Sequence, residues 1–400
     1  MVFIFKFICI YVYCKASLNW YLYPRYANNN TIEVNNVSIS NSRQFILINK
    51  QFLIKMSLPP TFVKGFHDEN VIKRMKYVKF GATDLVVSQL SLGTGGFSTL
   101  YGVFSLEECR ATVVDALKQG INYIDTAPYY GTGESETTLG QCLKGIPRQA
   151  YYVSTKVGRY ETDPKRMFDF SAKRTRESIE MSLKKLGIDY IDVINVHDIE
   201  FAPSLDIVLN ETLPTLVEAV KQGKARYIGV TGYPVSTLAE CIERSKIKID
   251  AVLSYSRLCL LDTALNDFLP VFQSKNLGIV NAAPACMGLL SSRGPQPWNI
   301  AQQYIKDACK TASEYCKEHG NIELCRLALY FSLNQPGPHT HLIGMNTRQL
   351  LKENLDVLFN GITDNEKEVL EYLQKNVFSK LKQGHWEGIE VANYRKAIST

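Results

Sequence analysis

The chain has 400 residues, of which 46% are hydrophobic and 21% are charged, and its formal net charge is +6 at pH 7. These values are typical of a globular protein, and the absence of any long Lys/Arg run argues against a nucleic-acid-binding surface. The 10 cysteines form no C-x-x-C pair and have no histidine at zinc-finger spacing, so we expect reduced thiols, no metal site and a cytoplasmic protein.

Residues 1–74 are expected to form a poorly ordered N-terminal extension. The apolar run Met1–Cys14 is too short to span a bilayer. It resembles the apolar region of a signal peptide, but an Asn-rich stretch follows in place of a small-residue cleavage site. We interpret residues 1–55 as an appended segment before a natural start at Met56, with a signal peptide as the alternative. We therefore expect no membrane partner unless the apolar segment is genuine.

From Met75 onward, short β-branched runs alternate with amphipathic stretches of helical length, which is typical of repeated βα units. The pattern predicts a β-hairpin first, with strands at Tyr77–Phe80 and Leu85–Val87. Eight further strands are then predicted, at Gln89–Leu92, Tyr123–Asp125, Tyr151–Lys156, Ile191–His197, Ala225–Val230, Ala251–Ser254, Gly278–Ala282 and His341–Ile343.

Helices are predicted between these strands, at Leu106–Gln119, Ala172–Leu186, Leu213–Gln222, Val235–Arg244, Ala301–Glu318 and Glu323–Leu333. The first follows Ser105, and Glu108 stands where a capping box places its acidic residue. Eight repeats predict an α/β protein with a closed (β/α)8 TIM barrel over residues 75–380 and a C-terminal tail over residues 381–400. An open doubly wound sheet is the alternative, but Ser98 replaces the last glycine of the dinucleotide fingerprint that would begin at Gly93.

Four polar residues follow or end successive predicted strands: Asp125, Tyr130, Lys156 and His197. Each alone has a structural explanation, such as a helix cap or a satisfied interior histidine, but all four together favour a catalytic site at the C-terminal face. Carbonyl reduction needs a proton donor beside the oxygen that gains charge. A tyrosine has a free pKa of about 10, and a nearby lysine ammonium shifts its equilibrium toward the phenolate unless desolvation opposes it. Asp125 would hold Lys156, and His197 would hydrogen-bond the substrate oxygen.

These residues resemble the signature of the aldo-keto reductase superfamily. The stretch from Asp125 to Glu134 matches the segment around that family's catalytic Asp and Tyr, and Lys156 and His197 match the other two members of its tetrad. The similarity covers about residues 75–358 and implies a (β/α)8 barrel that interconverts carbonyls and alcohols with NAD(P). Residues 281–290 (NAAPACMGLL) further resemble the L-galactose dehydrogenase and D-arabinose dehydrogenase-like subgroup.

The resemblance also implies a dinucleotide site. The residues that we assign to it are Gly93, Thr94, Gly95, Thr231, Ser254, Ala283, Pro284, Gly288, Leu289, Gly344, Asn346, Arg348, Glu353 and Asn354. Ala282 stands where many members stack an aromatic ring on the nicotinamide. Leu350 replaces the arginine that NADP-preferring members place four residues before the final Asn, so we expect NAD to be favoured over NADP, although Arg348 or Lys352 would reverse this preference by binding the 2′-phosphate.

We expect an oxidoreductase that converts an aldose, similar to L-galactose or D-arabinose, to its lactone. The alternatives are a general NADPH-dependent aldehyde reductase and a nucleotide-binding, redox-sensing partner subunit, which the fold alone does not exclude. A small-molecule partner and a monomer or weak oligomer are expected. Substrate selectivity is assigned to residues 158–170, 199–210 and 289–298, where Tyr160, Phe201 and Trp298 are candidates for pocket walls or for packing.

Overall fold

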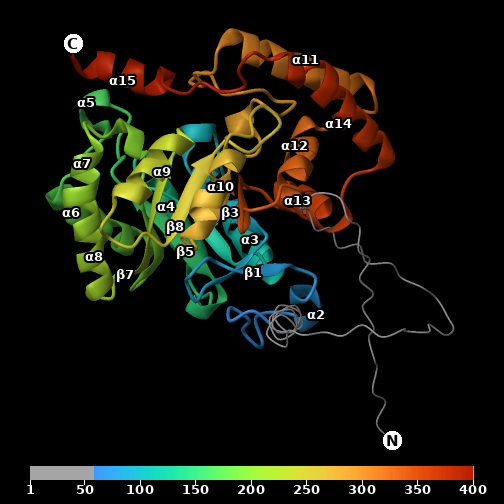
Figure 1. Cartoon of the computed structure of the whole chain (residues 1–400). Helices are drawn as coiled ribbons and strands as arrows, with labels where there is room; N and C mark the ends of the chain where they lie inside the picture. Colours follow the sequence, from blue (N-terminus) through green and yellow to red (C-terminus); the bar gives the residue numbers. More distant parts are fainter. Residues whose placement is uncertain (1–57, 400) are drawn as a thin grey trace, which may run out of the picture. The chain divides into compact units, whose positions relative to one another are not determined.

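Eight short parallel strands close into a barrel in the computed structural model, which describes residues 58–399 (Figure 1). In chain order the barrel strands are β3 (Leu90–Gly93), β4 (Tyr123–Asp125), β5 (Tyr152–Val157), β6 (Ile191–Val196), β7 (Ala225–Gly232), β8 (Ala251–Tyr255), β9 (Gly278–Ala282) and β10 (Thr340–Gly344). The last strand pairs with both β3 and β9, which closes the sheet and excludes the open doubly wound alternative. All eight predicted strands are present, so the (β/α)8 barrel is confirmed.

The predicted hairpin is also present, as the antiparallel pair β1 (Tyr77–Lys79) and β2 (Val86–Ser88). Phe80, which follows β1, packs with Tyr123 and Tyr152 at the starts of β4 and β5. A Cβ added to Gly278, the first residue of β9, would lie 2.4 Å from the Phe80 ring, so only glycine leaves space for this ring. The hairpin therefore closes the N-terminal end of the barrel, and the C-terminal end is left for function.

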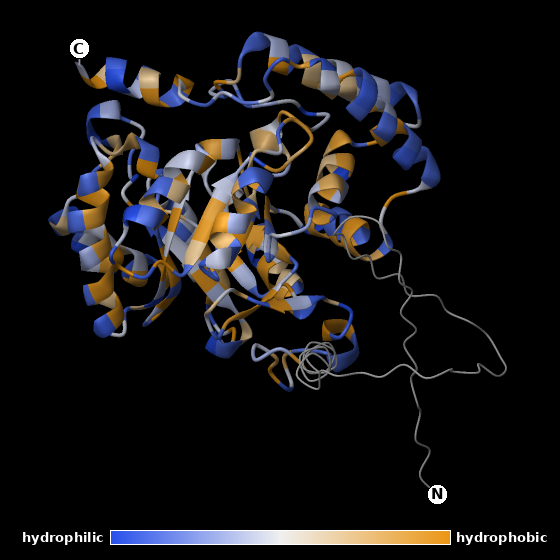
Figure 2. Cartoon of the chain, in the orientation of Figure 1, coloured by the Kyte–Doolittle hydropathy of each residue, from blue (hydrophilic) through white to orange (hydrophobic). Residues whose placement is uncertain are grey.

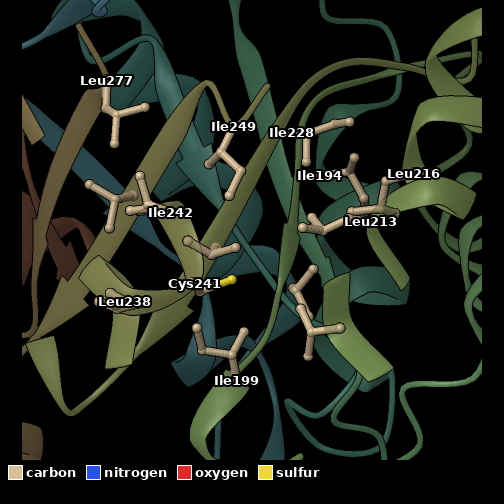
Figure 3. Close-up of a cluster of buried hydrophobic side chains, with 14 of the residues drawn as sticks. Ile194, Ile199, Leu213, Leu216, Ile228, Leu238, Cys241, Ile242, Ile249 and Leu277 are labelled. Carbon is tan, nitrogen blue, oxygen red and sulfur yellow. The ribbon is translucent and has the colours of Figure 1, made fainter. Parts of the chain in front are cut away.

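Amphipathic helices cover the outside of the barrel. They are α3 (Leu106–Lys118), α4 (Glu134–Leu143), α6 (Ala172–Leu186), α8 (Leu213–Lys221), α9 (Val235–Arg244), α10 (Leu265–Ser274), α11 (Gln303–Glu318), α12 (Leu324–Leu333), α13 (Arg348–Asn360) and α14 (Asp364–Asn376). In Figure 2 the central strands are mostly orange, whereas α11 and α14 carry much blue. Leu213 and Leu216 of α8 and Cys241 of α9 pack on strand residues such as Ile194 and Ile228 (Figure 3). Burial of these apolar side chains joins the helices to the barrel.

Shorter helices lie in the connections and near the chain ends. They are α2 (Glu69–Ile72), α5 (Pro164–Met167), α7 (Leu205–Ile207) and α15 (Ile389–Ser399), with the 3-10 segments η1 (Gly95–Phe97), η2 (Thr99–Tyr101), η3 (Arg148–Ala150), η4 (Ile199–Phe201), η6 (Cys286–Gly288) and η7 (Phe378–Lys380) and the π-helical turn η5 (Val208–Thr212). No helix within residues 58–399 is both long and apolar enough to cross a membrane.

Four of the helices that cover the barrel, α4, α10, α13 and α14, are not among the helices predicted from the sequence. Two of them, α4 and α10, each contain a residue that disfavours helices. In α4 this residue is Gly140, where an added Cβ would lie 2.2 Å from the carbonyl oxygen of Lys185. The glycine thus permits close contact between α4 and α6. In α10 the residue is Pro270, inside a helix whose buried side includes Leu265, Leu269 and Phe272. Tertiary packing outweighs local propensity in both.

Some residues on either side of the predicted barrel region, 75–380, also pack against it. Ile72 is buried, and the Thr61 hydroxyl accepts a hydrogen bond of 3.0 Å from the Asn122 side chain, so chain packed on the barrel begins well before residue 75. The stretch expected as a C-terminal tail contains the buried Trp386 and helix α15, which lies beside α5 (Figure 1). The predicted apolar segment Met1–Cys14 lies outside the described residues.

Candidate active site

A buried ion pair joins the ends of two neighbouring strands. Lys156 of β5 places its Nζ 2.5 Å from Oδ1 of Asp125, the last residue of β4, and only 1% of each residue is exposed. The ammonium also donates to the Thr126 carbonyl oxygen at 2.7 Å. The other carboxylate oxygen accepts from the Ser154 hydroxyl at 2.8 Å, and Asn195 of β6 donates to that hydroxyl at 2.9 Å. A hydrogen-bond network across three strands thus holds the ammonium in one place.

The turn after β4 brings Tyr130 over this pair. Lys156 Nζ lies 5.1 Å from the centroid of the Tyr130 ring. Gly131 follows with φ +60°, and a Cβ added there would lie 2.6 Å from the Ser98 side chain, so the turn requires glycine. The phenol is therefore fixed beside the ammonium by backbone geometry.

His197 follows β6, and its ring meets the Tyr130 ring edge-on with a centroid separation of 6.0 Å. Burial lowers the pKa of His197 well below its usual value, and the positive charges of Lys156 and Arg159 lower it further. The imidazole is therefore neutral near pH 7 and can donate or accept one hydrogen bond at each ring nitrogen according to its tautomer. The structure thus gathers all four predicted catalytic residues at the C-terminal end of the barrel.

The electrostatic effect on the phenol differs from the sequence-based expectation. Burial raises the pKa of Tyr130 well above its usual value, and the negative charges of Asp125 and Asp198 raise it further, while Arg159 opposes them. The shift toward the phenolate is not the net result, because desolvation of the buried phenol outweighs it and the charge of Lys156 is balanced by Asp125 at 2.5 Å. The phenol is consequently protonated in the free protein.

The residues assigned to a nicotinamide site lie around the same end of the barrel. Ser254 of β8 has a buried hydroxyl without a hydrogen-bond partner among residues 58–399, so it is available to an amide ligand. Thr231 of β7 instead accepts from the backbone N–H of Asp198 at 3.3 Å, and Thr94 donates to the carbonyl oxygen of Asp125 at 3.0 Å. These two hydroxyls position the strand ends.

The turn after β9 has an unusual backbone. Ala283, Cys286 and Met287 have φ of +54°, +50° and +52°, and Gly288 has φ +93°. Positive φ at non-glycine residues costs free energy and is concentrated at functional sites. The turn also includes Pro284 and Leu289, and its three non-glycine residues with positive φ make it a candidate for contact with a ligand.

The remaining predicted contacts lie at β3, β10 and the start of α13. Gly93 and Gly344 are paired in register, and a Cβ added to Gly93 would lie 3.3 Å from the Ile343 backbone. Gly95 begins η1, and the Asn346 side chain donates to the Gly96 carbonyl oxygen at 3.2 Å. The Thr347 hydroxyl caps α13, whose first turns carry Glu353 and the buried Asn354. A helix start of this kind favours anionic groups.

Arg348 is already engaged. Its backbone N–H donates to Glu108 Oε1 at 2.8 Å, and its guanidinium donates to Oε2 at 3.1 Å. The predicted capping box at Ser105 is therefore wrong: the Ser105 hydroxyl does cap α3, but the Glu108 carboxylate binds the start of α13. Two helices distant in sequence are linked by this contact.

Several polar residues of the site went unrecognised in the sequence. Arg159 follows β5 and pairs with Asp198 at 2.7 Å and with Glu390 of α15 at 2.9 Å. Glu200 lies beside them and accepts from the Tyr233 backbone N–H at 2.9 Å. The sequence did offer one indication of these residues, because Arg159, Asp198 and Glu200 lie in the loops that follow β5 and β6. Nothing in the sequence indicated that residues near 390 return to this face.

The three candidate wall residues have different surroundings. Tyr160 is buried and accepts from the Gly158 backbone N–H at 2.9 Å, so it packs within its loop. Phe201 stacks on Phe168 at a centroid distance of 4.3 Å, next to Arg159. Trp298 is partly exposed and meets Tyr101 edge-on at 5.4 Å.

Comparison with known proteins agrees with this geometry. The model of the aldo/keto reductase family matches residues 89–374. L-galactose dehydrogenase of Arabidopsis thaliana is 40% identical over 278 residues, which are 69% of this chain and 85% of that protein. D-arabinose 1-dehydrogenase of Saccharomyces cerevisiae is 32% identical over 290 residues, 68% of this chain and 84% of that protein. A Bacillus halodurans aldo-keto reductase structure in its holo form matches with a TM-score of 0.61 and 27% identity over 78% of this chain and 99% of its own.

Substituting Tyr130→Phe keeps the ring beside Lys156 and removes only the exchangeable proton. We expect kcat for carbonyl reduction to fall about 10²- to 10⁴-fold, because general acid catalysis is lost, with little change in the dissociation constant of the nicotinamide nucleotide. Steady-state kinetics and fluorescence titration measure the two quantities. Tyr372→Phe, on the outer helix α14, is the control, and full turnover by the Tyr130 variant would contradict the assignment.

Proposed function

This chain belongs to the aldo/keto reductase family, and we propose that it oxidises an aldose at the anomeric carbon to the corresponding lactone with NAD as the acceptor. Members of this family are NAD(P)-dependent oxidoreductases, and the barrel with its strand-end residues fits that chemistry. The observation that carries the proposal is the grouping of Tyr130, Lys156, Asp125 and His197 at one end of the barrel.

The four residues have complementary roles in this proposal. The nicotinamide, when bound, supplies the hydride acceptor. The phenolate form of Tyr130 takes the proton of the anomeric hydroxyl as base, and the Lys156 ammonium stabilises the negative charge that the phenolate oxygen carries until the proton arrives. Asp125 keeps Lys156 charged and directed at the ring. His197, neutral at physiological pH, hydrogen-bonds the same substrate oxygen and fixes its direction. In the reverse direction Tyr130 acts as the acid.

The aldose is proposed from the relatives. Two of them are named for sugars, L-galactose and D-arabinose, at 40% and 32% identity. A third, NADH-specific methylglyoxal reductase of Escherichia coli, is 28% identical and is named for a small aldehyde. General aldehyde reduction is therefore the second candidate. The free thiols among residues 58–399 fit a reducing compartment, so the proposal places the enzyme in the cytoplasm.

The preference for NAD follows from the contact between Glu108 and α13. A 2′-phosphate that approached the start of α13 would meet the Glu108 carboxylate, and Arg348 is already paired with it. The hydrogen bond from the Arg348 backbone N–H lowers the pKa of Glu108, and the hydrogen bond from the Arg348 side chain lowers it further. The carboxylate is therefore ionised at neutral pH. A negative charge at this position opposes a phosphate dianion and tolerates a ribose hydroxyl.

A panel of L-galactose, D-arabinose, their epimers and simple aldehydes, each assayed with NAD(H) and NADP(H), tests the proposed reaction. We expect at least one aldose to be oxidised with a higher kcat/KM than any simple aldehyde is reduced, and the product to be the lactone, identified by mass spectrometry. Faster reduction of simple aldehydes with NADPH would support the second candidate. Tight nucleotide binding without turnover of any sugar or aldehyde would indicate a redox-sensing subunit.

Glu108→Gln removes the negative charge near the start of α13 and keeps the side-chain shape. We expect the ratio of kcat/KM with NADP to that with NAD to rise about 2- to 10-fold, mainly through a lower KM for NADP. Glu107→Gln is the matched control, because it removes the same charge one residue away and leaves the contact with Arg348 intact. An equal change in both variants would show that only net charge matters.

A further inference from the structure

A second group of polar side chains lies buried beside the catalytic four. Arg159 is 9% exposed and Asp198 is 1% exposed, and their side chains are joined at 2.7 Å. Glu200 has one oxygen near Gly232, where an added Cβ would lie 2.6 Å from it. Asp198 follows His197 directly in the chain and Glu200 lies three residues after it, so the group adjoins the expected place of the substrate oxygen.

The side chains of this group have hydrogen-bonding atoms left over. Among residues 58–399 no partner is present for Arg159 Nε, Asp198 Oδ1, Glu200 Oε2 or His197 Nδ1, although each atom is buried. Buried polar atoms nearly always have a partner, because an unpaired one costs free energy. Four such atoms on residues next to Tyr130 indicate that a bound molecule completes their hydrogen bonds.

Aromatic rings fix the direction of the guanidinium. Its central carbon lies 3.9 Å from the Tyr129 ring centroid, 5.1 Å from that of Phe168 and 5.5 Å from that of Phe201. Tyr394 of α15 packs edge-on against Phe168 and Phe201. Arg159 is therefore held by rings from three loops and the last helix, and loses little freedom when it binds a ligand.

The C-terminal segment completes the enclosure. Trp386 stacks on Tyr233 at a centroid distance of 4.9 Å, and its backbone N–H donates to the Tyr233 hydroxyl at 3.2 Å. Glu387 pairs with Arg257, and Glu390 pairs with Arg159 at 2.9 Å. Two buried arginines thus anchor one segment, but only Arg159 also contacts the group next to His197.

We propose that Arg159, Asp198 and Glu200 form a subsite that binds the hydroxyl groups of a polyhydroxylated substrate, and that Glu390 holds Arg159 in place for this contact. The inference rests on the proposed function and names the residues that select a sugar over a simple aldehyde. The subsite offers guanidinium donors and carboxylate acceptors a few ångströms apart. A neutral hydroxyl donates and accepts and so satisfies both.

The test compares glyceraldehyde with propanal, two three-carbon aldehydes that differ only in hydroxyl groups, together with the aldose panel. A site built for hydroxyl groups discriminates strongly against analogues that lack them. For Arg159→Met we expect the ratio of kcat/KM for glyceraldehyde to that for propanal to fall about 10- to 100-fold, mainly through the KM for glyceraldehyde, and kcat/KM for the best aldose to fall with it. Arg159→Lys should recover part of the loss.

Two further variants keep the test decisive. Arg257→Met removes an equally buried arginine that anchors the same C-terminal segment, so it controls for loosening of that segment and should change both aldehydes alike. Glu200→Gln retains the acceptor for the Tyr233 N–H and replaces the free oxygen with a donor, so it should raise the KM for glyceraldehyde even if Arg159→Met does not fold.

The outcomes separate this inference from the proposed function. Equal losses for glyceraldehyde and propanal in Arg159→Met and Glu200→Gln, or no loss in either, would overturn the subsite. The wild-type enzyme could oxidise no aldose, while the Arg159 and Glu200 variants lose its preference for glyceraldehyde over propanal. That result would overturn the proposed function and retain the subsite.

Discussion

The chemistry of this site depends on a charged ammonium held inside a barrel. An unpaired ammonium at 1% exposure would be neutralised or expelled, and the 2.5 Å contact with Asp125 prevents both. Removing one partner of such a pair typically costs about 3–5 kcal/mol, so the two residues are constrained together. Parallel pairing of β4 with β5 makes the contact possible, because Asp125 of β4 is in register with Ser154 of β5, two residues before Lys156. The strand pairing that forms the barrel thus also sets the geometry of the ion pair.

The same pairing explains the resting charges of the site. Lys156 is balanced by Asp125, so it does not by itself ionise the phenol, and burial keeps Tyr130 protonated. Burial lowers the pKa of His197, the two cations nearby lower it further, and the imidazole is therefore neutral. The site therefore has one proton on the phenol and a neutral imidazole able to receive a substrate hydroxyl. Charges that the substrate and nucleotide bring, rather than those of the free protein, then decide when the proton moves.

Local sequence patterns predict the barrel well, because strand residues such as those of β6 are buried and β-branched and the helices carry one apolar side. The grouping of Asp125, Tyr130, Lys156 and His197 could also be predicted, since strand ends in such a barrel share one face. The contact of Glu108 with Arg348 joins residues 240 apart, and the pairing of Arg159 with Glu390 joins residues 231 apart. No local pattern specifies contacts between residues so far apart in the chain. The predictions of a capping box at Ser105 and of a tail after residue 380 therefore do not include these contacts. Helices α4 and α10 were missed for a related reason: Gly140 and Pro270 are acceptable only because of what packs against those helices.

In the proposed reaction the Lys156 ammonium stabilises the ionised form of Tyr130 during oxidation. The most direct measurement is the pH dependence of kcat/KM for aldose oxidation by the wild type and by Lys156→Met, with folding of the variant checked by circular dichroism. Oxidation requires the phenolate, so activity rises with pH until the phenol has titrated. Loss of the cation should raise the apparent pKa and displace the rising limb by about 1–2 pH units to the alkaline side. An unchanged profile at reduced rate would contradict the account.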